Sequence, residues 1–61
     1  MPSITVDIAP LTKEQKAQIS KEFTESISKV TGIDAEAFYI FFNEYPRDSI
    51  AVGGTLLSER R

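Results

Sequence analysis

The feature that most constrains the fold is a change in the spacing of apolar residues along the chain. In residues 3–8 apolar and polar residues alternate, which is the period of a strand with one buried face. In residues 13–31 apolar residues recur every three or four positions, which is typical of an amphipathic helix. Residues 38–44 again have the composition of a strand. This order predicts a βαβ unit, and because its crossover is right-handed in nearly all proteins, the two strands should be parallel neighbours.

The expected helix has sequence signals at both of its ends. Thr12 and Gln15 have the spacing of a capping box, in which each side chain accepts a hydrogen bond from the backbone amide of the other residue. Gly32 stands where a left-handed residue commonly ends a helix, and Asp34 can cap a short turn after it. These signals place the helix at residues 13–31.

The apolar residues indicate how the helix and the second strand pack. The helix carries one apolar stripe, made of Ile19, Phe23, Ile27 and Val30. The second strand is apolar on both faces, with Phe38, Ile40 and Phe42 on one face and Tyr39 and Phe41 on the other. A strand of this kind is covered on both sides, and one helix can cover only one of them. We therefore expect a second copy of the chain to bury the other face.

The remaining residues predict a turn and a short strand. The segment YPRDS, residues 45–49, is typical of a turn, and IAV, residues 50–52, of a third short strand. Gly53 and Gly54 then mark a bend in the backbone.

Length and composition narrow what can stabilise this fold. A chain of 61 residues is expected to form a single domain, residues 1–61, and a domain of this size buries only about 60% of its unfolded surface. The chain has no cysteine and no histidine, which excludes disulfides and disfavours zinc and copper sites. Oligomerisation is then the expected source of additional stability.

Charge and hydropathy argue against several classes of partner. The net charge is −2, so we expect no basic face that would bind the phosphates of a nucleic acid. The longest apolar run, AFYIFF, is too short to span a bilayer. No signal peptide or lipidation motif precedes the first strand, and we expect a cytoplasmic protein with no nucleic-acid or membrane partner.

Pro2 is the strongest candidate for a catalytic group. The acidic residues Asp7, Glu44 and Asp48 fit solvated or cap-forming positions better than a pair of catalytic carboxylates. Removal of the initiator methionine would leave the secondary amine of Pro2, and an α-amino group has a reference pKa of about 8. Burial in an apolar pocket or a nearby cation lowers that pKa, which makes the amine a competent general base. The competing interpretation is a proline tolerated at the first position of a strand.

Several segments together resemble one family, the 4-oxalocrotonate tautomerases. They are MP before a short strand, TKEQK at the helix start and EYPRDSIAVGG near the end, in a chain of 61 residues. The resemblance implies an α+β fold, a βαβ subunit with parallel strands and a short C-terminal β-hairpin. It also implies a homohexamer built as a trimer of dimers, in which two subunits form each four-stranded sheet. In this family the processed amino-terminal proline, here Pro2, is a general base, and neither a metal nor an organic cofactor takes part.

The chain departs from the family at three positions of the expected substrate site. Arginines of the family are replaced by Leu11 in the loop before the helix and by Tyr39 in the second strand. Ile50 stands where an aromatic residue of the family lines the pocket. The family's arginines hold substrate carboxylates, which suits the planar guanidinium, and Arg47 is the candidate to replace the lost charge. The predicted site therefore has Pro2 as its catalytic residue and, as substrate-binding residues, Tyr39, Arg47, Ile50 and Leu11.

The predicted function is the enol–keto isomerisation of a small-molecule substrate, a 2-hydroxydienoate or a 2-oxo acid. The pocket would lie between subunits and would hold dicarboxylates less well than the family's pocket does. Hydrolytic dehalogenation on the same scaffold is less favoured, because it needs strong carboxylate binding. The alternative is a noncatalytic oligomer with a binding or structural role, which the missing arginines support. A dimeric DNA-binding protein of the ribbon-helix-helix kind matches the length but not the acidic charge.

Overall fold

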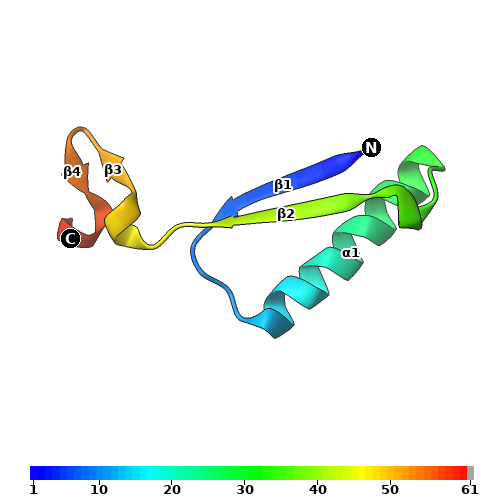
Figure 1. The fold of residues 1–61 in the computed structure, drawn as a ribbon, viewed down its shortest axis with the longest axis horizontal. Coiled ribbons are helices and arrows are strands. Elements are labelled where there is room, and N and C mark those ends of the chain that lie inside the picture. The colour runs from blue at the N-terminus through cyan, green and yellow to red at the C-terminus, as the bar shows by residue number, and fades with distance from the viewer. Residues whose placement is uncertain (61) are drawn as a thin grey trace.

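The computed structural model describes residues 1–60, which form a body, residues 1–45, and an arm, residues 46–60. The helix and strands in chain order are β1 (Ser3–Ile8), α1 (Lys13–Thr31), β2 (Tyr39–Glu44), β3 (Ala51–Val52) and β4 (Thr55–Leu56). Short 3₁₀ turns cover Ala35–Ala37, Arg47–Ser49 and Leu57–Glu59. In the body, α1 lies along a sheet made of β1 and β2, and the arm extends from the end of β2 away from both (Figure 1).

The strands β1 and β2 are parallel neighbours, as the order of the elements predicts. Ser3 lies opposite Tyr39 at one end of the pair, and Ile8 lies opposite Glu44 at the other. Parallel pairing needs a long crossover, and α1 supplies it by returning the chain to the start of the sheet. The expected α+β arrangement is confirmed, with the antiparallel hairpin of β3 and β4 near the C-terminus.

The strand β2 begins one residue later than the apolar run predicts. The Phe38 amide donates to the Ala35 carbonyl at 3.2 Å and so completes the short turn before the strand. The Tyr39 amide is instead bonded across the sheet, to the Pro2 carbonyl at 3.1 Å. Phe38 therefore belongs to the turn by its hydrogen bonding.

The predicted caps of α1 are confirmed, together with its bounds. The Thr12 hydroxyl accepts from the Gln15 amide at 3.1 Å, and the Gln15 side-chain oxygen accepts from the Thr12 amide at 2.9 Å. Gly32 has a φ of 77°, and its amide donates to the Ser28 carbonyl at 2.8 Å. Asp34 caps the short turn that follows.

The buried face of α1 differs from the predicted apolar stripe. Ile19 and Ile27 are half-buried, but Phe23 is 45% exposed and Val30 is 83% exposed. The other half-buried positions of the helix are polar, namely Lys16, Ser20, Thr24 and Ser28. Two strands about 4.8 Å apart form a sheet narrower than a helix about 10 Å across, so the sheet covers only one side of the stripe. The prediction that Val30 packs on the sheet is wrong.

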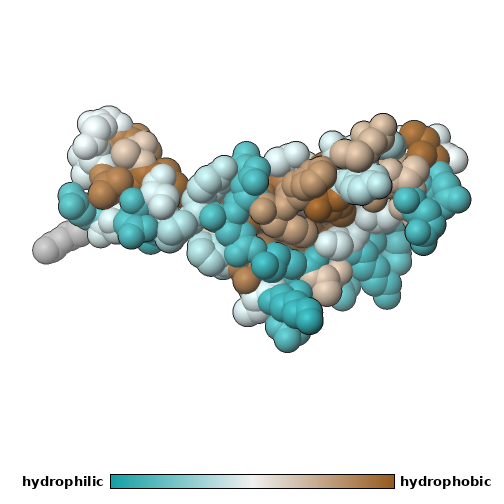
Figure 2. Space-filling model, viewed as in Figure 1, coloured by the Kyte–Doolittle hydropathy of each residue, from teal (hydrophilic) through white to brown (hydrophobic). Residues whose placement is uncertain are grey.

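The single chain has no fully buried core among residues 1–60. The radius of gyration is 15.1 Å, against about 10 Å for a compact domain of this length. Apolar side chains gather over the strands of the body and again on the arm (Figure 2). In the described part of the chain, no helix has the length and apolar character needed to cross a membrane. The chain thus exposes apolar surface that a compact monomer of this length would bury.

The arm is a small hairpin held by its own hydrogen bonds. Gly53 and Gly54 have φ angles of 61° and 84°, the left-handed backbone that a two-residue hairpin turn of type I′ requires. The Leu57 amide donates to the Ile50 carbonyl at 2.8 Å, and the Arg47 guanidinium donates to the Leu57 carbonyl at 2.6 Å. The bend predicted at the two glycines is therefore confirmed.

Candidate active site

Pro2 directly precedes β1 and is anchored to the neighbouring strand. It is half-buried, and its carbonyl accepts a hydrogen bond from the Tyr39 amide at 3.1 Å. Met1 is 80% exposed and so is accessible. While Met1 is attached, the Pro2 nitrogen is a tertiary amide without a basic lone pair. Without Met1, the same atom is a secondary amine at the start of β1.

Tyr39, whose amide is bonded to the Pro2 carbonyl, has its side chain on the open face, which is our name for the side of the sheet that α1 does not cover. The open face is formed by Ser3, Thr5, Asp7, Tyr39, Phe41 and Asn43. The Tyr39 ring stacks on Phe41, with the ring centroids 6.4 Å apart and an angle of 11° between the planes. Tyr39 is 52% exposed and Phe41 is 46% exposed. The open face near Pro2 is therefore aromatic on the β2 side.

The other predicted site residues lie far from Pro2 within one chain. Leu11 is in the loop that follows β1, and Arg47 and Ile50 are in the arm that follows β2. Pro2 and Tyr39 are at the opposite end of these strands. Each strand has 6 residues at about 3.3 Å per residue, which separates the two groups by about 20 Å. Of the predicted set, the single chain therefore brings together only Pro2 and Tyr39.

Arg47 and Ile50 are both tied to Leu57 within the arm. Nη2 of Arg47 donates to the Leu57 carbonyl at 2.6 Å, and the Ile50 carbonyl accepts from the Leu57 amide at 2.8 Å. A guanidinium has five N–H donors, so this bond uses one of them and allows a further contact. The two predicted binding residues thus belong to one locally fixed surface of the arm.

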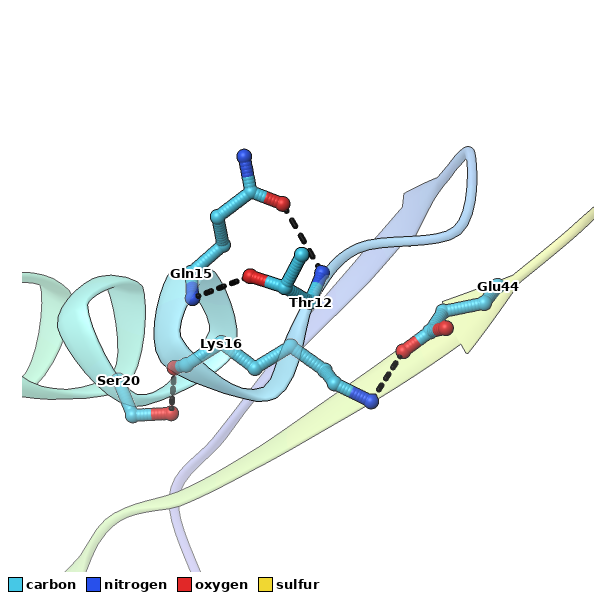
Figure 3. A network of polar contacts seen from close by, with 5 residues as sticks. All are labelled: Thr12, Gln15, Lys16, Ser20 and Glu44. Carbon is cyan, nitrogen blue, oxygen red and sulfur yellow. Dashed lines mark hydrogen bonds and ion pairs between the residues drawn. The ribbon is translucent and has the colours of Figure 1, made fainter.

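Figure 3 shows an ion pair at the end of the body next to the arm. The sequence alone does not indicate this pair. Nζ of Lys16, in the first turn of α1, donates to Oε1 of Glu44 at 2.6 Å. This hydrogen bond and the Lys16 charge hold the pKa of the Glu44 carboxyl below its ordinary value, and the Leu11 backbone amide also lowers it. Glu44 therefore joins the end of β2 to the start of α1. Sequence patterns do not predict the pair, because Lys16 and Glu44 lie far apart along the chain.

The open face carries no basic residue. Neither SITVDI of β1 nor YIFFNE of β2 contains lysine or arginine. Nδ2 of Asn43 donates to Oδ1 of Asp7 at 2.9 Å, near the end of the sheet remote from Pro2. A small molecule at Pro2 would meet aromatic rings from the same strand pair, and a cation would have to come from another element or another copy.

Comparison with known proteins places this arrangement in one family. The model of the tautomerase enzyme family matches residues 2–60. A probable tautomerase of Lactococcus lactis is 39% identical, over 98% of this chain and 100% of its own length. The 2-hydroxymuconate tautomerase of Bacillus subtilis is 35% identical, over 97% of each chain.

Solved structures agree with these sequence relatives. YwhB, a homologue of 4-oxalocrotonate tautomerase, superposes with a TM-score of 0.84 at 33% identity, covering 98% of this chain and 100% of its own. A second 4-oxalocrotonate tautomerase homologue, TTHB242, has a TM-score of 0.86 at 27% identity, covering 100% of this chain and 98% of its own. Because the family model, the relatives and the fold all span nearly the whole chain, the protein belongs to the tautomerase family.

Proposed function

We propose that this protein is an enol–keto tautomerase in which Pro2, made amino-terminal by removal of Met1, is the general base. The observation that carries the proposal is the position of Pro2, half-buried at the head of β1 and hydrogen-bonded through its carbonyl to Tyr39. An α-amino group has a reference pKa of about 8, and apolar surroundings disfavour its charged form. An amine held in this way is suited to accept a proton near neutral pH.

The reaction needs only the movement of one proton at a time. The neutral Pro2 amine takes the hydroxyl proton of a 2-hydroxydienoate or of another 2-oxo acid enol. The C–O bond becomes a carbonyl, the carbon–carbon double bond is lost, and the charged amine returns a proton to carbon. Atoms and electrons balance, and the amine is neutral again at the end. This is the reaction class of the 4-oxalocrotonate tautomerase-like isomerases that the sequence resembles.

The proposed pocket is completed by other copies of the chain. Leu11, Arg47 and Ile50 lie about 20 Å from Pro2 within one chain, so they can join it only from a neighbouring subunit. The long radius of gyration and the exposed apolar side chains support such an assembly. We assign it as a homohexamer, a trimer of dimers, which light scattering on the purified protein would test.

The experiment that tests the proposal compares wild type with Pro2→Ala. Samples whose amino terminus is verified by intact mass are assayed for ketonisation of phenylenolpyruvate and 2-hydroxymuconate. We expect Pro2→Ala to lower kcat/KM by about 100-fold or more, since general-base catalysis contributes at least that much in typical enzymes. Pro10→Ala is the matched control, because Pro10 is exposed in the loop after β1 and should keep activity. Equal rates for wild type and Pro2→Ala would remove Pro2 from the mechanism.

A noncatalytic role is the second candidate, and one observation favours it. The strands beside Pro2 supply no lysine or arginine to hold a carboxylate. The same assay separates the two functions. An oligomer with a free Pro2 amine that converts neither enol would support a binding or structural role on the tautomerase scaffold.

A further inference from the structure

The surface of β2 next to Pro2 is aromatic, and its two rings are stacked on each other. The Tyr39 backbone amide donates to the Pro2 carbonyl at 3.1 Å, and the Tyr39 ring stacks on Phe41 with the centroids 6.4 Å apart and 11° between the planes. Both rings remain about half exposed in the single chain, so contacts within the chain leave part of each ring accessible. Aromatic rings attract a third ring in offset or edge-to-face packing. This surface therefore suits an aryl group more than a charged one.

The charged side chains at the Pro2 end of the body also disfavour a second carboxylate on the substrate. The last turn of α1 carries Lys29, while the short turn before β2 carries Asp34 and Glu36. These are one cation and two anions, all at surface positions. At the other end of the sheet, Lys16 pairs with Glu44 and Arg47 donates to Leu57. Within one chain, acidic side chains thus outnumber basic ones at the Pro2 end of the body, which disfavours a substrate with a second carboxylate there.

We propose that Tyr39 makes the site selective for enols of 2-oxo acids that bear one carboxylate and an aromatic substituent, against dicarboxylates. This inference rests on the proposed function of Pro2. The reacting carbons lie at the Pro2 amine, and the aryl group packs on the Tyr39 ring that Phe41 supports. The Tyr39 hydroxyl is a neutral donor for the single carboxylate or the enol oxygen.

Kinetics on two enols test the preference. With Met1 removed, wild type should have a kcat/KM for phenylenolpyruvate about tenfold or more above that for 2-hydroxymuconate, the range that pocket contacts commonly give. Tyr39→Arg should shift this ratio toward the dicarboxylate by about tenfold or more, mainly through KM, because a guanidinium binds a carboxylate with two hydrogen bonds. Tyr39→Phe keeps the ring and should keep the aryl preference.

Val30→Arg is the matched control. It adds the same charge at the same end of the body, on a helix position that is 83% exposed, and should leave the ratio unchanged. A higher kcat/KM for the dicarboxylate in wild type would overturn the inference, and so would an equal shift of the ratio in Val30→Arg and Tyr39→Arg.

Binding to Pro2→Ala separates this inference from the proposed function. Calorimetric titration of that variant should show phenylpyruvate binding about tenfold more tightly than the dicarboxylate 2-oxoadipate. If wild type converts neither enol while this order of binding holds, the general-base role fails and the ring preference stands. Tighter binding of 2-oxoadipate than of phenylpyruvate would contradict the aryl preference. It would leave the general-base role of Pro2 intact.

Discussion

The body and the arm are built from different kinds of contact. In the body, β1 pairs with β2 over 6 residues each, α1 is capped at both ends, and Lys16 bonds Glu44 across elements. In the arm, β3 and β4 have 2 residues each, and the hydrogen bonds join only positions close in sequence. The body thus has contacts that fix its overall arrangement. The arm has a local shape, and it extends away from the sheet and from α1 (Figure 1).

The residues of the proposed site are likewise divided between the body and the arm. Pro2 and Tyr39 belong to the body, whereas Arg47 and Ile50 belong to the arm. In the proposed mechanism the chemistry depends on the body, and closure of the pocket depends on where a second copy places the arm. Variants in the two regions should fail in different ways.

The largest expected effect comes from replacing Leu56, an apolar residue of the arm, by a charged residue. Leu56 is 37% exposed in the single chain, and we expect a neighbouring copy to cover it. Leu56→Asp should weaken assembly by about 100-fold or more, since it removes an apolar contact and buries an unpaired charge. Light scattering over a dilution series measures the assembly, and activity should fall with it.

Val30→Asp is the matched control in the body for Leu56→Asp in the arm. Val30 is apolar and 83% exposed on α1, where the sheet does not cover it. The variant should assemble and react as wild type does. Equal loss of assembly in Val30→Asp and Leu56→Asp would mean that the arm has no special part in the oligomer.

A smaller effect is expected from the left-handed glycines of the two regions. A Cβ at Gly32 or Gly54 meets no atom within 4 Å, so substitution acts through the backbone alone, at φ of 77° and 84°. Each change to alanine should cost about 1–2 kcal/mol. Gly32→Ala should lower the thermal midpoint of the whole protein, whereas Gly54→Ala should mainly raise the concentration at which the oligomer dissociates. The same phenotype in both variants would contradict separate roles for body and arm.

The smallest effect concerns the pH dependence that Glu44 gives to the body. Because Lys16 holds the Glu44 pKa below its ordinary 4.5, the ion pair stabilises the fold above that pH. The contribution is lost as the pH falls through the lowered pKa. Glu44→Gln should therefore reduce stability slightly at neutral pH and flatten the acid side of the curve, as measured by urea unfolding. A steeper acid dependence in the variant would contradict the pairing.

Local signals predict the fold well where they act within one element. The capping box at Thr12 and Gln15 and the left-handed Gly32 define α1, and alternation defines β1. The start of β2 depends on a competing hydrogen bond of Phe38, which a run of apolar residues does not reveal. Exposure of Val30 depends on the width of the sheet below the helix, which is a tertiary property.

The candidate site is harder to predict because its residues come from distant parts of the chain. Pro2 stands out through its chemistry, and its register with β2 explains why Tyr39 lies beside it. The bond from Arg47 to Leu57 and the pairing of Lys16 with Glu44 depend on how turns and elements meet in space. Sequence spacing carries no direct signal for such contacts.

The central claim, that the Pro2 amine is the base, is tested most directly by two synthetic chains that differ only in Met1. Residues 1–61 and residues 2–61 are refolded, checked by light scattering and assayed on phenylenolpyruvate at equal concentration. We predict that the chain beginning at Pro2 is active and that the chain retaining Met1 is slower by about 100-fold or more, since its nitrogen is an amide. Equal activity of the two chains would contradict the account.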